Sequence, residues 1–271
     1  PRRKEPYMFG EDENKIQFFE TKLSEYQMQV YNEFEPNLSS SNRPALIDVC
    51  KAVFPGQLEK MKKSKKKRSV SQKKMFQKYF NKHDNGNYTF QEDDPFFKES
   101  SKYCPKLKAA YDEIINSTGI VFVYSELLEM GSILFALFLQ YNGFTHLQLN
   151  QSSKIIAGKN YIVLNKPDDL RVYKQKFESS NIDGSLVKII IGTRKVSQGI
   201  TLLNIRQLHI LEGWHNLSRL KQVTGRAIRR QSHHALLEQF RNVTVYYHIS
   251  SFDEKYYEEI FNLKYIKSKI E

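Results

Sequence analysis

Three arginines and a glycine lie close together in the segment QVTGRAIRRQSH, which spans residues 222–233. Arg226, Arg229 and Arg230 all follow Gly225 within five residues. A guanidinium group is planar, stays charged in proteins and can donate to two oxygens at once. Arginines in this pattern can therefore bind phosphate, but they can equally form the solvated face of an ordinary helix. The segment by itself leaves both interpretations open.

Hydroxyl groups and glycines gather in other short segments that follow apolar runs. Ser125 ends the apolar run GIVFVYS, and GTRKVSQGITL (192–202) holds two glycines and three hydroxyl side chains. The segment EGWHN (212–216) follows a third run. Hydroxyls, backbone amides and arginines on one rim suit contacts with phosphate. The alternative is that these glycines only form turns.

The elements that must position these residues can be read from the apolar pattern. We expect buried strands at 119–125, 186–193, 207–213 and 243–250, because each is a short apolar or β-branched run. We expect helices at 105–117, 126–143, 169–180, from about 216 or 218 onward, and at 252–271. This alternation predicts an α/β fold, a parallel sheet with helices on both faces. Ligands of such sheets bind at the carboxyl ends of the strands.

The first hundred residues have a different composition. Apolar residues in 14–35 recur at roughly helical spacing, with an interruption near Ser24. Residues 57–103 hold a lysine tract followed by a polar, turn-rich stretch. We therefore expect three parts, which are a linking segment at 1–56, a basic insertion at 57–103 and the α/β domain at 104–271.

The order and spacing of these segments resemble the second RecA-like lobe of superfamily 2 helicases and translocases. YSELLEMG (124–131) is similar to motif IV and GTRKVSQGITL to motif V, while QVTGRAIRR fits the motif VI pattern Q-x-x-G-R-x-x-R. The resemblance covers roughly residues 104–271. It is closest to helicase-like proteins of large cytoplasmic DNA viruses, of the nucleoside triphosphatase I and early-transcription-factor small-subunit type. One departure is Thr201, which stands where relatives usually carry Asp or Asn.

The resemblance implies a role for each motif residue. In this family the nucleotide binds between two lobes, and motif VI of the second lobe supplies arginines to phosphates held by the first. It implies that Arg229 is an arginine finger, Arg226 a second phosphate or interlobe contact, and Gln222 a nucleotide-site or coupling residue. Arg230 matches no motif position and is expected to be a surface residue. The further residues implied at the ATP site are Gly199 and Thr201.

The resemblance and the charge distribution both imply DNA or RNA as a partner. Residues 57–82 hold 11 Lys/Arg and one Glu, whereas the rest of the chain holds 31 Lys/Arg against 29 Asp/Glu. Such a tract can bind phosphates, but it can equally be a solvated loop or a localisation signal. The expected backbone contacts are Ser125, Thr193 and Arg194. The tract's candidate contacts are Lys62, Lys63, Lys65, Lys66, Lys67 and Arg68.

Two family elements are missing from the 271 residues. No G-x-x-x-x-G-K-[ST] motif occurs, and the acidic pairs at 112–113 and 253–254 lie in expected helices rather than after a buried strand. The chain also begins at Pro1 rather than Met, so we expect a part of a longer protein that supplies the first lobe. ATP and Mg²⁺ would be bound only in that longer protein, and the chain alone is predicted to be inactive. The alternative is an inactive nucleic-acid-binding or scaffold module, and viral transcription or replication proteins are possible partners of either.

A few patterns are weaker signals. Counted from position 81, the spacing of a calcium loop places Asn and His where that ion needs carboxylates, so we expect a plain turn at 84–87. Cys50 and Cys104 form no spaced pair, which indicates a reducing, intracellular setting and no metal site. For a viral protein that setting would be the host cytoplasm and the virion. The longest apolar run, 133–139, is too short to span a membrane.

Overall fold

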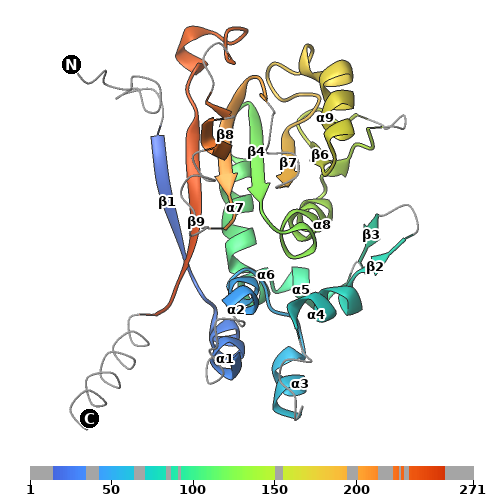
Figure 1. Cartoon of the computed structure of the whole chain (residues 1–271), viewed down its shortest axis with the longest axis vertical. Coiled ribbons are helices and arrows are strands. Elements are labelled where there is room, and N and C mark those ends of the chain that lie inside the picture. Colours follow the sequence, from blue (N-terminus) through green and yellow to red (C-terminus); the bar gives the residue numbers. More distant parts are fainter. Residues whose placement is uncertain are drawn as a thin grey trace, which may run out of the picture.

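The centre of the molecule is a seven-stranded parallel sheet with the strand order β1-β9-β8-β4-β7-β6-β5 (Figure 1). This computed structural model describes residues 15–34, 43–63, 71–83, 87–90, 93–149, 155–193, 201–212, 222–225, 227–228 and 232–253. The sheet strands are β1 (Lys15–Lys22), β4 (Ile120–Ser125), β5 (Thr145–His146), β6 (Asn160–Leu164), β7 (Ile189–Thr193), β8 (Ile205–Ile210) and β9 (Thr244–Ser251). A separate antiparallel pair joins β2 (Asn81–Lys82) and β3 (Tyr88–Thr89).

Helices lie on both faces of the sheet and at one of its ends (Figure 1). The α-helices are α1 (Glu25–Phe34), α2 (Arg43–Val49), α3 (Gln57–Lys63), α4 (Gln72–Tyr79), α5 (Pro95–Lys98), α6 (Ser100–Tyr103), α7 (Pro105–Ile115), α8 (Leu134–Tyr141) and α9 (Pro167–Tyr173). Two π-helices, η4 (Leu128–Ile133) and η5 (Lys174–Glu178), and one 3₁₀-helix, η6 (Glu238–Phe240), complete the described elements. No helix among the described residues is long and apolar enough to cross a membrane.

The two faces of the sheet carry two separate hydrophobic cores. Strand β4 supplies both, since Val121 and Val123 belong to the first core while Phe122 and Tyr124 belong to the second. Helices α7 and α8 pack in the first core, and α9 packs in the second. Every residue of β4 is buried, as its continuous apolar sequence predicts for a central parallel strand. The expected parallel α/β fold is therefore confirmed.

The helices before α7 share the first core with the sheet. Phe54, Phe76, Phe80 and Phe96 are all buried there, and the rings of Phe54 and Phe96 stack at 5.1 Å between centroids. The described parts of 57–103 therefore pack as one body with α7 and α8, although their composition is that of an insertion. The three-part division of the chain stays a prediction.

The expected helical pattern in 14–35 is wrong before Ser24. Residues 15–22 form strand β1, which pairs with β9 along its whole length, from Lys15 opposite Thr244 to Lys22 opposite Ser251. The helix starts only after Ser24, whose hydroxyl accepts from the backbone of Gln27 at 3.1 Å. The side chain of Gln27 accepts in turn from the backbone of Ser24 at 3.1 Å, which forms a capping box.

Most of the elements expected from residue 104 onward are confirmed with small shifts of their bounds. The structure has strands at all four expected positions and helices at 105–115, 134–141 and 167–173. Two further strands, β5 with two residues and β6 with five, are not among those expected from the sequence. The expected closing helix falls almost wholly within 254–271, which lies outside the described residues.

Candidate functional site

The candidate motifs meet at the carboxyl edge of the sheet. Strand β4 ends at Ser125 and β7 at Thr193, and these two residues are register partners on adjacent strands. On the other side of β4, strand β8 ends at Ile210 and the chain continues to Glu212. Figure 1 shows the arrowheads of β4 and β8 pointing to the end of the sheet where α2 and α6 lie. Residues from motifs IV and V are thus neighbours, as the sequence predicts for a parallel sheet.

A buried hydrogen-bond network joins the ends of β4 and β8. The hydroxyl of Ser125 donates to Glu212 Oε1 at 2.6 Å, and the backbone N–H of Glu126 donates to Glu212 Oε2 at 3.0 Å. Lys51 Nζ donates to Glu212 Oε1 at 3.1 Å. Ser125 and Lys51 are fully buried and Glu212 is 3% exposed. The carboxylate therefore holds the start of motif IV in place.

Lys51 connects this network to the N-terminal helices. Its ammonium lies 3.4 Å from Asp48 Oδ1 as well as 3.1 Å from Glu212 Oε1. Burial raises the pKa of Asp48, while the charge of Lys51 acts in the opposite direction. A buried ammonium needs such partners, because an unpaired charge in the interior is very costly. This ion pair thus joins Lys51 to Glu212, which lies 161 positions later in the sequence.

A second buried lysine lies beside the same carboxylate. Burial lowers the pKa of Lys106 to about 8, and the charge of Glu212 partly opposes this shift. The neighbouring Cys50 thiol has a raised pKa, again chiefly because of burial. None of the motifs includes Lys51 or Lys106, and the sequence gives no role to Glu212. Two of these residues do have a signal in the sequence, since Lys51 lies inside the apolar run ALIDVCKAVF and Glu212 lies at the end of the apolar run QLHIL.

Ser125 has a different setting from the one expected. We expected this side chain to contact a nucleic-acid backbone, but it is fully buried, and its hydroxyl donates to Glu212 and lies 3.0 Å from the Leu127 carbonyl oxygen. The burial argues against a direct contact and gives Ser125 a positioning role at the start of motif IV. The contact itself stays a prediction.

Motif V lies only partly within the described residues. Thr193 is 5% exposed, and its buried Oγ1 has no hydrogen-bond partner among the residues that the structure describes. Thr201 is half-buried. Arg194 and Gly199 fall within 194–200, outside the described residues. The end of β7 therefore offers one hydroxyl without a partner at the carboxyl edge.

Motif VI packs a short helical segment on the second core. Residues 222–225 and 227 are helical, and Val223 and Ala227 are buried in that core. The hydroxyl oxygens of Thr224 and Tyr247 lie 3.2 Å apart, which joins the segment to β9. Gln222 is exposed. The positions of Arg226, Arg229 and Arg230 lie outside the described residues.

The lysine tract is described at its two flanks. Lys62 and Lys63 are exposed at the end of α3, and the exposed Lys73 and Lys74 lie on α4. The same two helices bury apolar side chains in the first core, so their charged side chains point to solvent from fixed positions. The tract members outside the described residues are Lys65, Lys66, Lys67 and Arg68.

Positions 84–86 and 92 of the calcium-loop spacing, and with them most of the expected turn at 84–87, lie outside the described residues. His83 Nε2 lies 2.9 Å from Thr89 Oγ1, so these two would-be ligands bind each other. The backbone N–H of His83 donates to the carbonyl of Asn87 at 2.8 Å, as in a hairpin connection. No group of three or more His, Cys, Asp or Glu in the described part of the chain could hold a metal ion.

Comparison with known proteins gives viral relatives and one similar fold. No family model matches the chain. It is 33% identical over 138 residues to a protein of Acanthamoeba polyphaga mimivirus that is named as an ATP-dependent RNA helicase, covering 49% of this chain and 23% of the relative. It is 27% identical over 201 residues to a termination factor NPH-I homolog of African swine fever virus (isolate Tick/Malawi/Lil 20-1/1983), covering 60% of this chain and 28% of the relative. The aligned part is thus less than a third of the length of either relative.

The fold is similar to that of part of a solved ATPase domain. The crystal structure of the C-terminal part of the Fun30 ATPase domain superposes with a TM-score of 0.55 at 13% identity, covering 88% of this chain and 86% of the other. The parallel sheet with helices on both faces is therefore a RecA-like fold. Together, the similarity to these viral proteins and the shared fold confirm the resemblance that the motifs predict.

Proposed function

We propose that the chain is the second lobe of an ATP-dependent nucleic-acid helicase or translocase. The observation that carries this proposal is that the three strands that precede the motif segments in the sequence end side by side at one edge of one sheet. Motif IV begins at the end of β4, motif V begins at the end of β7, and the segment leading to motif VI comes after β8 in the sequence. Strands β7 and β8 are the two hydrogen-bonded neighbours of β4. The names of the viral relatives support an ATP-dependent activity of the longer protein.

The residues assigned to ATP suit a phosphate ligand by their chemistry. They offer amide, hydroxyl and guanidinium donors, which match phosphate oxygens. Gln222 is exposed on a helical segment that Val223 and Ala227 fix to the core. Positions 226 and 229 are four and seven residues after Gln222, and in a helix these spacings predict that all three side chains lie on one face. The substrate would be ATP with Mg²⁺, and the first lobe would hold the metal ion. This chain would contribute Arg229 and Arg226, which would contact the phosphates of ATP.

The nucleic-acid side of the site is a further part of the proposal. The exposed lysines at the ends of the tract, together with Thr193 and Arg194, would contact the phosphate backbone of DNA or RNA. The other partners would be the first RecA-like lobe of the same protein and viral transcription or replication proteins. Such a protein would work in the host cytoplasm and the virion.

The test is the Arg229→Ala substitution in the full-length protein. We expect the nucleic-acid-stimulated ATPase rate to fall on the order of 10³-fold, the scale of an arginine finger. The guanidinium neutralises charge that develops only as the γ-phosphoryl group departs, so the loss should fall on kcat more than on ATP affinity. Arg229→Lys should not restore the rate, because a point charge cannot replace a two-pronged donor. Steady-state kinetics measures both parameters.

Arg230→Ala is the matched control, one residue further along, and should change little. If it is as damaging as Arg229→Ala while both variants fold normally, the motif VI register is wrong. A wild-type full-length protein that binds nucleic acid but hydrolyses no ATP would instead support the inactive scaffold.

A further inference from the structure

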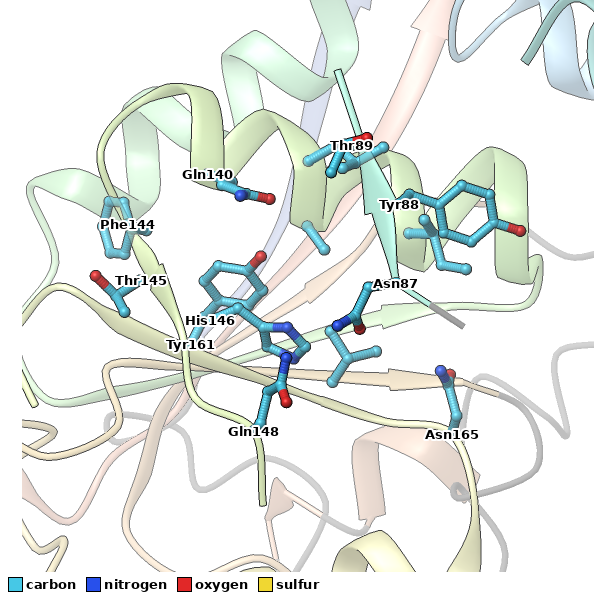
Figure 2. Close-up of a pocket in the computed structure, with 14 residues that line it drawn as sticks. Asn87, Tyr88, Thr89, Gln140, Phe144, Thr145, His146, Gln148, Tyr161 and Asn165 are labelled. Carbon is cyan, nitrogen blue, oxygen red and sulfur yellow. The ribbon is translucent and has the colours of Figure 1, made fainter. Parts of the chain in front are cut away.

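A cavity lies on the opposite side of the sheet from the motif VI segment. It has a volume of about 470 Å³ and opens between the β2–β3 hairpin, helix α8 and the strands β5 and β6 (Figure 2). Its volume is in the range of small-molecule sites, roughly 300–1,000 Å³. None of the residues that we assign to ATP lines it. The cavity is therefore separate from the proposed nucleotide site.

The walls of the cavity are part apolar and part polar, and uncharged throughout. Helix α8 and the residue before it supply Ile133, Ala136 and Leu137. Polar side chains from α8 and β5 include Gln140 and Thr145. No Lys, Arg, Asp or Glu is among the described lining residues. A phosphate or a metal ion would find no charge to balance its own here, whereas a neutral group with polar edges would fit.

An aromatic pair forms one wall of the cavity. The rings of His146 and Tyr161 are stacked, with centroids 5.0 Å apart and planes inclined by 11°. Figure 2 shows His146 next to Tyr161, with Gln148 beside it. Burial lowers the pKa of His146, which favours a neutral imidazole with one donor and one acceptor nitrogen. Within the described part of the chain, neither ring nitrogen of His146 makes a hydrogen bond.

Two other polar side chains of the lining, Gln140 and Thr145, have no hydrogen-bond partner in the described part of the chain. The Gln140 amide is exposed on α8, and neither it nor the Thr145 hydroxyl bonds to a described residue. Together with the imidazole these groups offer donors and acceptors beside a ring that can stack. A planar, uncharged ligand with hydrogen-bonding edges satisfies both features at once.

Positive charge lies directly beside this neutral cavity. Lys82 on β2 is the register partner of Tyr88, and its ammonium lies 5.9 Å from the centre of the Tyr88 ring, which lines the cavity. Helix α4, which leads into this hairpin, carries the exposed Lys74 and Lys78, and also Lys73, which pairs with Glu129 at 3.7 Å. A polyanion held by these lysines would bring its uncharged groups to the cavity mouth.

We propose that the cavity binds a nucleobase of a single-stranded nucleic acid whose phosphates lie along the lysines of α4 and β2. The proposal rests on nucleic-acid binding as proposed above and adds to it a base-binding pocket formed by His146, Gln140 and Thr145. Base–aromatic stacking tolerates any sequence, because every base has a π-face. The pocket would therefore fix the position of the strand without selecting a sequence.

The experiment compares two oligonucleotides with the full-length protein. One is a single strand with bases, and the other has the same length and phosphates but abasic sugars throughout. At equal salt, we expect wild type to prefer the strand with bases by roughly tenfold, the scale of one stacked base. His146→Ala should lose most of this preference while its affinity for the abasic strand is unchanged. Fluorescence anisotropy measures both affinities.

Two further variants complete the test. Gln140→Leu removes the amide that would bond to the base edge and keeps a side chain of similar size, and it should weaken the preference. His234→Ala changes an exposed histidine elsewhere on the surface and should keep the preference. The proposal is overturned if folded His146→Ala and Gln140→Leu both keep the full preference, the result expected if the cavity instead takes a side chain of a protein partner. A protein that binds neither strand would contradict the proposed function itself.

Discussion

At the scale of single residues, Glu212 joins three parts of the candidate site. Its two carboxylate oxygens accept from Ser125, Lys51 and the backbone of Glu126. It lies two residues after the end of β8 and precedes the segment that leads to motif VI. A substitution at Glu212 can therefore displace both motif IV and the connection to motif VI, although our proposal places this side chain in contact with neither ATP nor nucleic acid.

Removing this carboxylate should destabilise the fold strongly. Glu212→Ala leaves the buried Lys51 with only Asp48, at 3.4 Å, as an ionic partner. Breaking a buried pair in this way costs about 3–5 kcal/mol, because the remaining charge stays buried. Chemical denaturation of the chain measures the free energy of unfolding. The control is Asp93→Ala, which removes an exposed ion pair with Lys98, and equal effects of the two variants would contradict a structural role for Glu212.

At the scale of elements, the π-helix η4 brings motif IV close to β4. Its wider turn is closed by a bond from the Ser132 N–H to the Leu127 carbonyl at 3.0 Å. Gly131 in this turn faces Ser125, and a Cβ there would overlap Ser125 Oγ and lie 2.9 Å from Ser125 Cβ. The close approach of η4 to the strand therefore requires glycine at 131. Single π-helical turns are often found at functional sites.

Gly131→Ala should separate η4 from the end of β4. The added methyl group would also lie 3.1 Å from Glu212 Oε1, so relief of the overlap must disturb the buried network. We expect a loss of about 1–3 kcal/mol in the free energy of unfolding, as for other overpacked sites. Gly225→Ala is the matched control, since its Cβ would meet nothing within 4 Å. A Gly131→Ala variant with the melting temperature of wild type would show that the turn has room to move.

At the scale of the whole molecule, the positive charge is anchored to the folded core. The net charge is +12, and nearly all of it comes from residues 57–82. Helices α3 and α4 at the ends of this tract bury Met61, Met75 and Phe76. Deleting the tract would therefore remove part of the core, so its charges are better tested by substitution.

The double variant Lys62→Gln/Lys63→Gln tests whether the tract contacts phosphates. Each phosphate contact releases counterions, so losing two contacts should lower the slope of log affinity against log salt by roughly 1.4–1.8. Binding of the full-length protein to one oligonucleotide over a range of salt concentrations measures the slope. Lys22→Gln/Lys159→Gln removes the same charge from exposed sites outside the tract. If the two double variants have equal slopes, the tract is a solvated face or a localisation signal.

Local patterns in the sequence determined the class of the fold. The strands β4 and β7 are short, mostly apolar runs, and a central parallel strand buried on both faces requires such a run. Motifs IV and V begin at the ends of these two strands, so their meeting at the carboxyl edge could be predicted before any coordinates. The roles of the motif VI arginines remain predictions from their spacing and from the resemblance.

Only the tertiary structure decided which distant residues complete the site. The sequence of β1 shows no strand-like alternation, because most side chains of β1 are exposed. Its pairing partner β9 lies more than 200 positions away, so no local pattern indicates the pairing. Lys51 reads as an ordinary lysine until the fold brings it to Glu212, 161 positions later. The cavity is formed by β3, α8, β5 and β6, none of which carries a motif. Periodicity reports which face of an element is buried, but pairing over such separations depends on how the faces pack together.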